Sequence, residues 1–153
     1  MDFDGPDPNA RIRTLNATDL GRLVAIDAQH TGRRRETWFS ARLARALDDS
    51  AVRVSLGAEI DGTLVGAILG DVQYGEYGVA EPVAVLDTIL VDTARSGQGI
   101  GKALIEHMFR NLGALNIEKV RTEVAWTDQG LLGFLAREGF TPAPRLVLER
   151  GLG

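Results

Sequence analysis

A buried-strand pattern, a glycine-rich turn and an amphipathic helix follow one another without interruption in the second half of this 153-residue sequence. Residues 83–91 form an almost continuous apolar run, which is typical of a central strand covered on both faces. Glycines then cluster in the short connection to the helix. Helix residues on one face recur at steps of three and one: Gly101, Leu104, Ile105, Met108, Phe109 and Leu112. A strand that enters a helix through such a turn indicates an α/β domain.

The rest of the chain adds helices and strands around this unit. Alternating apolar and polar residues predict a strand over 52–60, and Asp61-Gly62 predicts a tight hairpin to a strand over 64–69. Residues 70–81 are polar and glycine-rich, which is typical of a loop. Further strands are expected at 12–15, 120–126 and 146–148, and helices after a cap at Thr18, over 35–47 and over 128–138. The expected fold is α/β with a mixed (α+β) sheet, antiparallel through the hairpin.

Composition excludes several classes of protein. Hydrophobic residues make up 44% and charged residues 25%, as in globular domains, and this excludes a disordered chain. The formal net charge of −4 argues against a nucleic-acid partner. The absence of cysteine excludes disulfides, thiolate catalysis and zinc–thiolate sites, and no cluster of other ligands has the spacing of a metal site.

The chain is expected to form one domain in the cytoplasm. Residues 1–9 hold prolines and aspartates and are predicted to be a flexible lead-in rather than a signal peptide. Residues 10–153 match the size of a single domain. No apolar run approaches the ~20 residues of a membrane span, so no membrane partner is expected.

The glycine turn is a candidate phosphate site. Unpaired N–H groups and the dipole of the first helical turn attract a phosphate, and glycines allow it to approach the backbone. A P-loop is unlike this segment, because Ser96 and Ala103 stand at its first glycine and its hydroxyl position. The dinucleotide fingerprint also fails, because Lys102 replaces its last glycine. These residues alone leave open both a phosphate ligand and a purely structural turn.

Three segments, in order, resemble the GCN5-related N-acetyltransferase (GNAT) superfamily. Residues 96–101, Ser-Gly-Gln-Gly-Ile-Gly, resemble its acetyl-CoA motif [RQ]-x-x-G-x-[GA], with Ser96 in the place of Arg or Gln. Residues 59–66 resemble the family's second hairpin, and residues 123–128 with 134–140 resemble its second cofactor motif. The resemblance covers roughly residues 10–150 in element order.

The resemblance implies a GNAT-like sheet that splays between its fourth and fifth strands and holds acetyl-CoA in the opening. The backbone of Ile89, Leu90 and Val91 would line the acetyl-pantetheine arm. The pyrophosphate would bind the turn formed by Ser96, Gly97, Gln98, Gly99, Ile100, Gly101 and Lys102. Asp128 stands where the family often has an asparagine in its cofactor motif. No metal is implied.

Acetyl transfer to an amine requires a group that accepts the proton of the ammonium, and a carboxylate can do this. Glu123 matches the glutamate of a Leu-Glu-Val segment in the ribosomal-protein-alanine acetyltransferase branch. Asp87 lies inside an apolar strand, which is costly unless it is solvated at a site or paired with a buried arginine. The family's usual acid, a tyrosine, is replaced by Leu135, and Tyr77 or Tyr74 is the substitute candidate.

The sequence therefore predicts an acetyl-CoA-dependent N-acetyltransferase, in which a primary amine attacks the thioester directly. The alternative is a non-catalytic acyl-CoA-binding regulatory module, because Leu135 replaces the tyrosine. The acceptor stays open among a protein N-terminus, lysine, polyamine, amino sugar and small amine. Acidic side chains in residues 74–81 would favour a cationic amine. Dimers are frequent in the family, which makes a homodimer an expectation of the resemblance.

Overall fold

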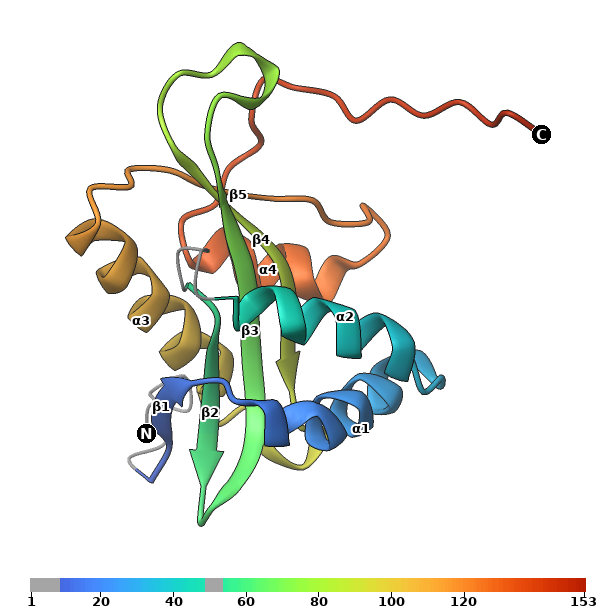
Figure 1. The fold of residues 1–153 in the computed structure, drawn as a ribbon, viewed down its shortest axis with the longest axis vertical. Coiled ribbons are helices and arrows are strands. Elements are labelled where there is room, and N and C mark those ends of the chain that lie inside the picture. Colours follow the sequence, from blue (N-terminus) through green and yellow to red (C-terminus); the bar gives the residue numbers. More distant parts are fainter. Residues whose placement is uncertain (1–8, 49–53) are drawn as a thin grey trace. The chain divides into compact units, whose positions relative to one another are not determined.

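The computed structural model describes residues 9–48 and 54–153 (Figure 1). The described strands form one sheet in sequential order: β1 (Arg11–Thr14), β2 (Leu56–Ile60), β3 (Thr63–Gln73), β4 (Val83–Val91) and β5 (Val120–Thr122). Neighbours from β1 to β4 are antiparallel, and β5 is parallel to β4. The described helices are α1 (Leu20–Thr31), α2 (Glu36–Ala46), α3 (Ile100–Ala114) and α4 (Gln129–Arg137). The mixed sheet expected from the sequence is confirmed.

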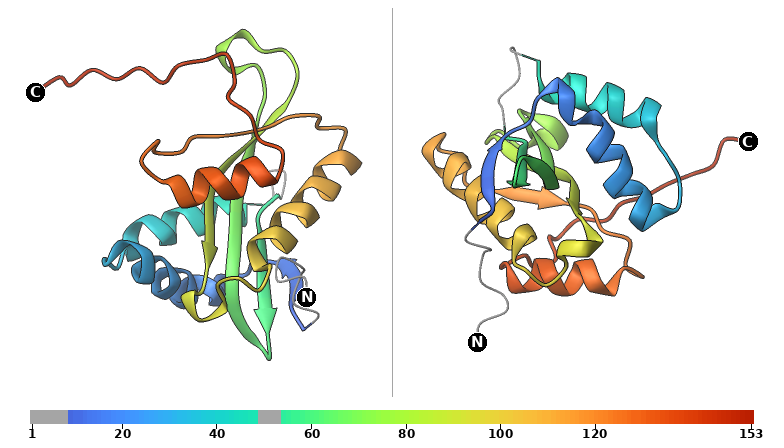
Figure 2. Two further views of the ribbon diagram at one scale, coloured as in Figure 1. Left: turned by 180° about the vertical axis from the view of Figure 1, so that it is seen from behind. Right: turned by 90° about the horizontal axis from the view of Figure 1, so that it is seen from below.

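The chain divides into two compact units, one up to Glu123 and one over Val124–Gly153. The first unit contains the sheet and helices α1 to α3, and the second contains α4. Within the first unit, α1 and α2 cover one face of the sheet and α3 covers the other (Figure 2). Central strand β3 is buried on both faces over 64–70, which explains its nearly continuous apolar sequence.

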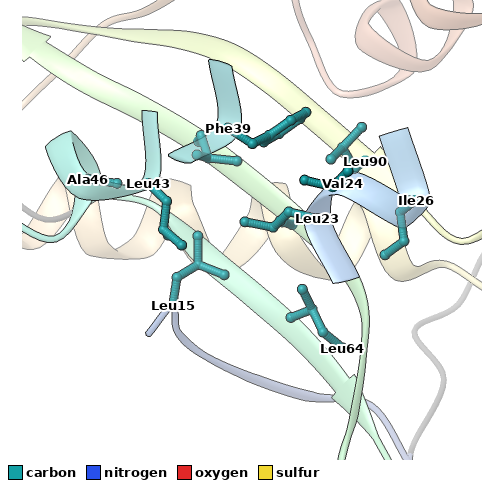
Figure 3. Close-up of a cluster of buried hydrophobic side chains, with 11 residues drawn as sticks. Leu15, Leu23, Val24, Ile26, Phe39, Leu43, Ala46, Leu64 and Leu90 are labelled. Carbon is teal, nitrogen blue, oxygen red and sulfur yellow. The ribbon is translucent and has the colours of Figure 1, made fainter. Parts of the chain in front are cut away.

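Apolar side chains from helices and strands make up the core on the α1 and α2 side. Figure 3 shows this cluster, which joins the two helices to the sheet: Leu15, Leu23, Val24, Ile26, Phe39, Leu43, Ala46, Leu64, Ala67, Leu69 and Leu90. Asp27 lies on the same buried face of α1, and the guanidinium of Arg35 binds both of its oxygens at 2.7 and 2.8 Å. This ion pair explains how a carboxylate is tolerated inside an apolar stripe.

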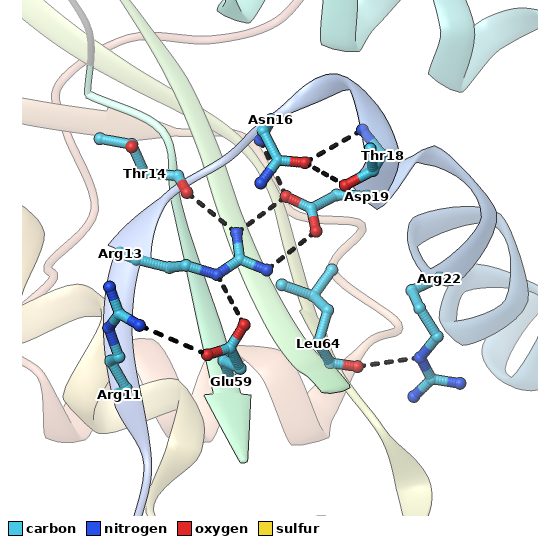
Figure 4. Close-up of polar contacts among 9 residues, drawn as sticks. All are labelled: Arg11, Arg13, Thr14, Asn16, Thr18, Asp19, Arg22, Glu59 and Leu64. Atoms are coloured by element: carbon cyan, nitrogen blue, oxygen red, sulfur yellow. Dashed lines mark hydrogen bonds and ion pairs between the residues drawn. The ribbon is translucent and has the colours of Figure 1, made fainter. Parts of the chain in front are cut away.

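A second buried carboxylate, that of Asp19, lies directly before the first residue of α1 (Figure 4). Asp19 accepts two hydrogen bonds of 2.9 Å from Arg13 and one of 2.8 Å from the N–H of Asn16. Burial raises the pKa of Asp19, but these hydrogen bonds outweigh it and the pKa lies below the ordinary value. Asn16 caps the short 3-10 helix η1 (Ala17–Asp19) that leads into α1, so the expected cap at Thr18 is wrong by two residues.

The strand boundaries show where the sequence patterns hold. The hairpin at Asp61 and Gly62 is confirmed, and both residues have the positive φ that such a turn requires. The bounds of β4 agree with the expected 83–91. The expected loop over 70–81 is wrong for its first four residues, because β3 runs on to Gln73. A Cβ at Gly70 would lie 2.8 Å from the Val85 carbonyl oxygen, so this glycine permits close strand approach rather than a turn.

The other corrections lie toward the ends of predicted strands. The strand expected over 120–126 ends at Thr122, and Trp126 is 88% exposed. Residues 146–148 are extended and exposed but form no strand in the described part of the chain, since a strand exists only through pairing. The lead-in expected at 1–9 falls outside the described residues except for Asn9, and so do residues 52 and 53 of the strand predicted over 52–60, which the structure begins at Leu56.

Candidate active site

Strands β4 and β5 separate after three residue pairs. Ala84, Val85 and Leu86 pair with Val120–Thr122, and the Thr122 hydroxyl donates a 2.7 Å hydrogen bond to the Leu86 carbonyl. Beyond this point β4 continues to Val91, paired with β3 alone among the described strands. The splay expected between the fourth and fifth strands is confirmed. It leaves residues 87–91 as an open edge inside the sheet.

A β-bulge at Asp87 determines which backbone groups face that edge. Leu69 pairs with Thr88 and Gly70 with Leu86, so Asp87 is an extra residue. Beyond the bulge, the N–H of Asp92 donates to the Val65 carbonyl at 2.8 Å. Groups toward and away from β3 alternate along an antiparallel strand, so the N–H and C=O of Ile89 and Val91 point to the open edge. These are two of the residues expected to line an acetyl-pantetheine arm.

Side chains of α1 hold the far end of this open stretch. The Nε2 of His30 lies 2.8 Å from the Val91 carbonyl oxygen. Asp92 accepts hydrogen bonds from the Ala94 N–H at 3.0 Å, from Arg22 at 2.9 Å and from Gln29 at 3.2 Å. The Ala94 hydrogen bond, followed by those from Gln29 and Arg22, outweighs burial and keeps the pKa of Asp92 below its ordinary value.

Sequence reasoning missed these tethers. The available signal is their spacing, because Arg22, Gln29 and His30 are seven and one apart and therefore share one side of α1. Periodicity shows that polar residues share a side of a helix but does not identify the carbonyl or carboxylate that they reach, so His30 reads as an ordinary surface residue.

The glycine turn presents unpaired backbone donors at the start of α3. Gly97 and Gly99 have φ of 78° and 76°, the left-handed region that favours glycine, and α3 begins at Ile100. The first helical hydrogen bond runs from the Ala103 N–H to the Gly99 carbonyl at 2.9 Å. The N–H groups of the preceding helical residues, Ile100 to Lys102, therefore have no partner within the helix. Beyond its chain neighbours, no protein atom lies within 4 Å of a Cβ built at Gly97, so the turn leaves room for a phosphate group beside these donors.

The candidate base Asp87 is engaged by helix α2. Its Oδ2 lies 3.0 Å from Nε and 2.9 Å from Nη2 of Arg42, a side chain that is 2% exposed. Its Oδ1 accepts a 2.7 Å hydrogen bond from the Thr88 hydroxyl. The structure shows the pairing with a buried arginine, and Asp87 is at the same time exposed to solvent.

The second candidate base, Glu123, directly follows the last residue of β5. It is exposed, and no hydrogen bond or ion pair joins its carboxylate to another described residue of its own unit. Leu86 and Thr122 form the last pair of β4 and β5, and the point beyond it where the two chain segments separate is called the fork. Asp87 and Glu123 are the first residues after the fork on their two segments. The structure thus puts both candidate carboxylates at the start of the open edge.

The remaining candidates lie elsewhere. Tyr77 is 84% exposed in the 3-10 turn η2 (Glu76–Gly78), and Tyr74 is exposed as well. In the second unit, Asp128 caps α4 and accepts a 3.1 Å hydrogen bond from the Leu131 N–H. Leu135, at the position of the family's tyrosine, is buried. Within the described part of the first unit, no hydrogen bond joins Tyr77 to Asp87 or Glu123.

Comparisons with known proteins now identify the class. The pattern of the acetyltransferase (GNAT) family matches residues 21–140, and the chain therefore belongs to this family of acetyltransferase enzymes. No curated protein matches the sequence.

Solved structures share the fold at low sequence identity. Aminoglycoside N-acetyltransferase AAC(6')-Iy in complex with CoA has a TM-score of 0.77 at 19% identity, covering 94% of this chain and 95% of its own. A ribosomal-protein-alanine N-acetyltransferase from Brucella melitensis biovar Abortus 2308 has 0.74 at 20% identity, covering 93% and 99%. A transcriptional regulator from Bacillus halodurans C-125 has 0.76 at 18% identity, covering 94% and 99%.

The described residues show neither a membrane-spanning helix nor a metal-binding cluster. None of their helices is both long and apolar enough to cross a membrane. No three histidine, cysteine, aspartate or glutamate side chains in the described ranges gather as a metal site would require.

Proposed function

We propose that this chain is an acetyl-CoA-dependent N-acetyltransferase that acts on a primary amine. The observation that carries the proposal is the continuity between the open edge of β4 and the glycine turn. Residues 87–91 leave backbone groups facing the opening, and the same strand leads through Asp92 into the turn before α3. An extended thioester ending in a diphosphate matches this order of a free strand edge and an anion-binding helix start.

The chain's own residues would hold the cosubstrate through the backbone. The C=O of Ile89 and the N–H of Val91 would bind the amides of the pantetheine arm as an added strand would, with Leu90 between them. The Val91 carbonyl already lies 2.8 Å from Nε2 of His30. The diphosphate would lie against the turn from Ser96 to Lys102, where the N–H groups of Ile100 to Lys102 have no partner within the helix. Because these contacts are to backbone groups, Ser96 in place of Arg or Gln removes none of them. The CoA bound to AAC(6')-Iy, which has the same fold, supports this choice of cosubstrate.

Proton transfer would begin at Glu123. This exposed carboxylate at the fork would accept a proton from the ammonium, directly or through water. The amine nitrogen then forms a bond to the thioester carbonyl carbon, and the carbon–sulfur bond breaks. An outward N–H of β4 nearer Glu123, that of Ile89, would stabilise the negative charge that develops on the carbonyl oxygen. The attacking nitrogen loses a proton as it becomes the amide nitrogen, and the leaving thiolate would take its proton from this nitrogen or from solvent, with Tyr77 as the side-chain candidate.

The acceptor would be a cationic amine. A shallow hollow of the first unit is lined by Gln73, Gly75, Glu76, Val79, Glu81, Val83 and Arg121. Its glutamates Glu76 and Glu81 would attract an ammonium group. Two proteins of the same fold, an aminoglycoside N-acetyltransferase and a ribosomal-protein-alanine N-acetyltransferase, are N-acetyltransferases, which supports an amine as the acceptor. We further propose a cytoplasmic enzyme that works as a homodimer, as the resemblance implies.

A thiol-release assay with acetyl-CoA and a panel of amines and peptides tests this function, with mass spectrometry to find any product heavier by one acetyl group. We expect turnover with at least one cationic amine, and a loss of it in Glu123→Gln. Leu135, buried where the family has its tyrosine, keeps a non-catalytic acyl-CoA-binding module as the second candidate. Tight acetyl-CoA binding without turnover across the panel would favour that module.

A further inference from the structure

An ion pair links the bulge of β4 to helix α2. The Arg42 guanidinium contacts Asp87 Oδ2 through both Nε and Nη2, at 3.0 and 2.9 Å. Arg42 is 2% exposed, whereas the side chain of Asp87 is 30% exposed. A guanidinium this deeply buried is costly without a nearby carboxylate, because its lost hydration has to be offset. The position of Asp87 and that of α2 therefore depend on each other.

This ion pair depends on the charge of Asp87. A proton on Asp87 would remove the negative charge that balances Arg42, and Asp71 alone, with its Oδ2 3.4 Å from Nη2, would remain beside the buried cation. The other oxygen of Asp87 is held by the Thr88 hydroxyl. Glu123 has no such partner within its unit, so the proton can move to Glu123 without breaking an ion pair.

Asp87 is the extra residue of the bulge, so its position determines which backbone groups of β4 face the opening. Before the bulge, the backbone groups of Ala84 and Leu86 point toward β5. Without an extra residue in β4, every second residue would continue to point this way. The backbone groups of Leu90 would then face the opening, and those of Ile89 and Val91 would face β3. The side chain that ties the extra residue to α2 thus also fixes the direction of the next backbone groups.

We propose that the Arg42–Asp87 pair is a positioning device: it holds the bulge of β4 and aims the Ile89 and Val91 backbone groups at the cosubstrate. Asp87 is then a positioning residue, and Glu123 is the proton acceptor. This inference rests on the proposed use of acetyl-CoA.

Helix α2 offers a matched control. Arg45 lies three residues after Arg42 and reaches the same two carboxylates, at 3.1 Å from Asp71 and 3.7 Å from Asp87. Its side chain is 59% exposed, and an exposed ion pair contributes little to stability. Arg45→Met therefore removes a neighbouring guanidinium while the bulge keeps its buried partner.

Calorimetric titration of the full chain with acetyl-CoA tests the proposal, with amide NMR spectra that follow Ile89 and Val91. We expect Arg42→Met and Asp87→Asn each to weaken acetyl-CoA binding about tenfold and to shift both amides, because small misplacements of binding groups are costly. The double variant should be no weaker than the weaker single variant, since both remove one interaction. Arg45→Met should stay within about twofold of wild type.

Arg42→Lys keeps the charge and loses the two-point contact, so it serves as the second variant if Arg42→Met fails to fold; we expect weaker acetyl-CoA binding and an unchanged KM for the amine. Asp87→Asn should keep the acid limb of the pH profile of kcat/KM. Unchanged acetyl-CoA binding in Arg42→Lys and Asp87→Asn, or loss of the acid limb in Asp87→Asn with binding intact, would overturn the positioning role. A wild-type chain that does not bind acetyl-CoA would instead contradict the proposed function, and the inference with it.

Discussion

The two halves of β4 are held in different ways. Residues 83–86 are fixed by strand pairing, with β3 on one side and β5 on the other. Residues 87–91 lack β5, and side chains hold this half instead: Arg42 binds Asp87, and His30 reaches the Val91 carbonyl. Another strand would pair the outward groups of this edge in turn, whereas His30 contacts the Val91 carbonyl alone among the outward groups of Ile89 and Val91. Helix side chains provide the rigidity that the missing strand would have supplied.

The same contrast separates the two segments that leave the fork. Beyond Leu86, β4 is tethered to α2 through Asp87. Beyond Thr122 the chain continues through Glu123, whose carboxylate no described residue of its unit binds. A tethered group is suited to fixing geometry, and an exposed carboxylate is suited to exchanging a proton with substrate or water. This division predicts that substitutions at the fork will affect either chemistry or binding, according to the segment.

The largest effect is expected at Glu123. Glu123→Gln keeps the size of the side chain and removes its basicity, so kcat should fall about 10²–10⁴-fold, the usual contribution of a positioned base. Affinity for acetyl-CoA, measured by calorimetry, should not change. Steady-state kinetics with the best amine of the panel provide the measurement. A kcat within threefold of wild type would show that the two segments are not divided in this way.

A side chain in the glycine turn should affect binding instead. Gly99 has φ of 76°, and any L-residue there is strained as well as bulky against the diphosphate. Gly99→Val should weaken acetyl-CoA binding about 100-fold with little change in affinity for the amine. Gly113→Ala, a replacement at a helical glycine with open space around it, is the control. Equal acetyl-CoA affinity in the two variants would refute the placement of the diphosphate.

Local patterns in the sequence predicted most of the sheet and the glycine turn. The apolar run of β4, the Asp61-Gly62 hairpin and the glycine spacing each report on nearby residues, and the structure has all three. The sequence also predicted an unusual environment for Asp87, since an ionised carboxylate in an apolar strand needs an explanation. It could not choose between a site and a buried partner, because Arg42 lies 45 residues away.

Other features depend on long-range geometry that no local pattern encodes. The loop expected at 70–73 is strand because these residues pair with residues 83–86 of β4. The early end of β5 follows from the divergence of two strands, which periodicity in β5 alone does not show. The bulge is likewise a relation between β3 and β4. Sequence reasoning therefore located the site, and the structure adds how its edge is held.

The tether at Asp92 should show its effect in pH-dependent stability. Because the folded-state pKa of Asp92 is lowered, first by the Ala94 N–H, its charge stabilises the fold at a pH above about 4, the ordinary value. This stabilisation is lost as the pH falls through the lowered pKa. At neutral pH, Asp92→Asn should reduce the free energy of unfolding by about 1–2 kcal/mol. Denaturant unfolding at about pH 6 and about pH 3 should show the gap between wild type and variant closing at the acidic end. A gap that does not change with pH would mean that the charge of Asp92 is not what holds β4.

The smallest effect is expected at His30. Its ring nitrogen lies 2.8 Å from the Val91 carbonyl, and a hydrogen bond at an exposed site contributes about 0.5–1.5 kcal/mol. His30→Ala should therefore raise the KM for acetyl-CoA about threefold to tenfold while kcat stays the same. His107→Ala, at a half-buried position of α3 whose ring contacts Arg110, controls for the loss of an imidazole. A drop in kcat with an unchanged KM would instead give His30 a part in proton transfer, and the tethered half of β4 would then contribute to the chemistry as well as to binding.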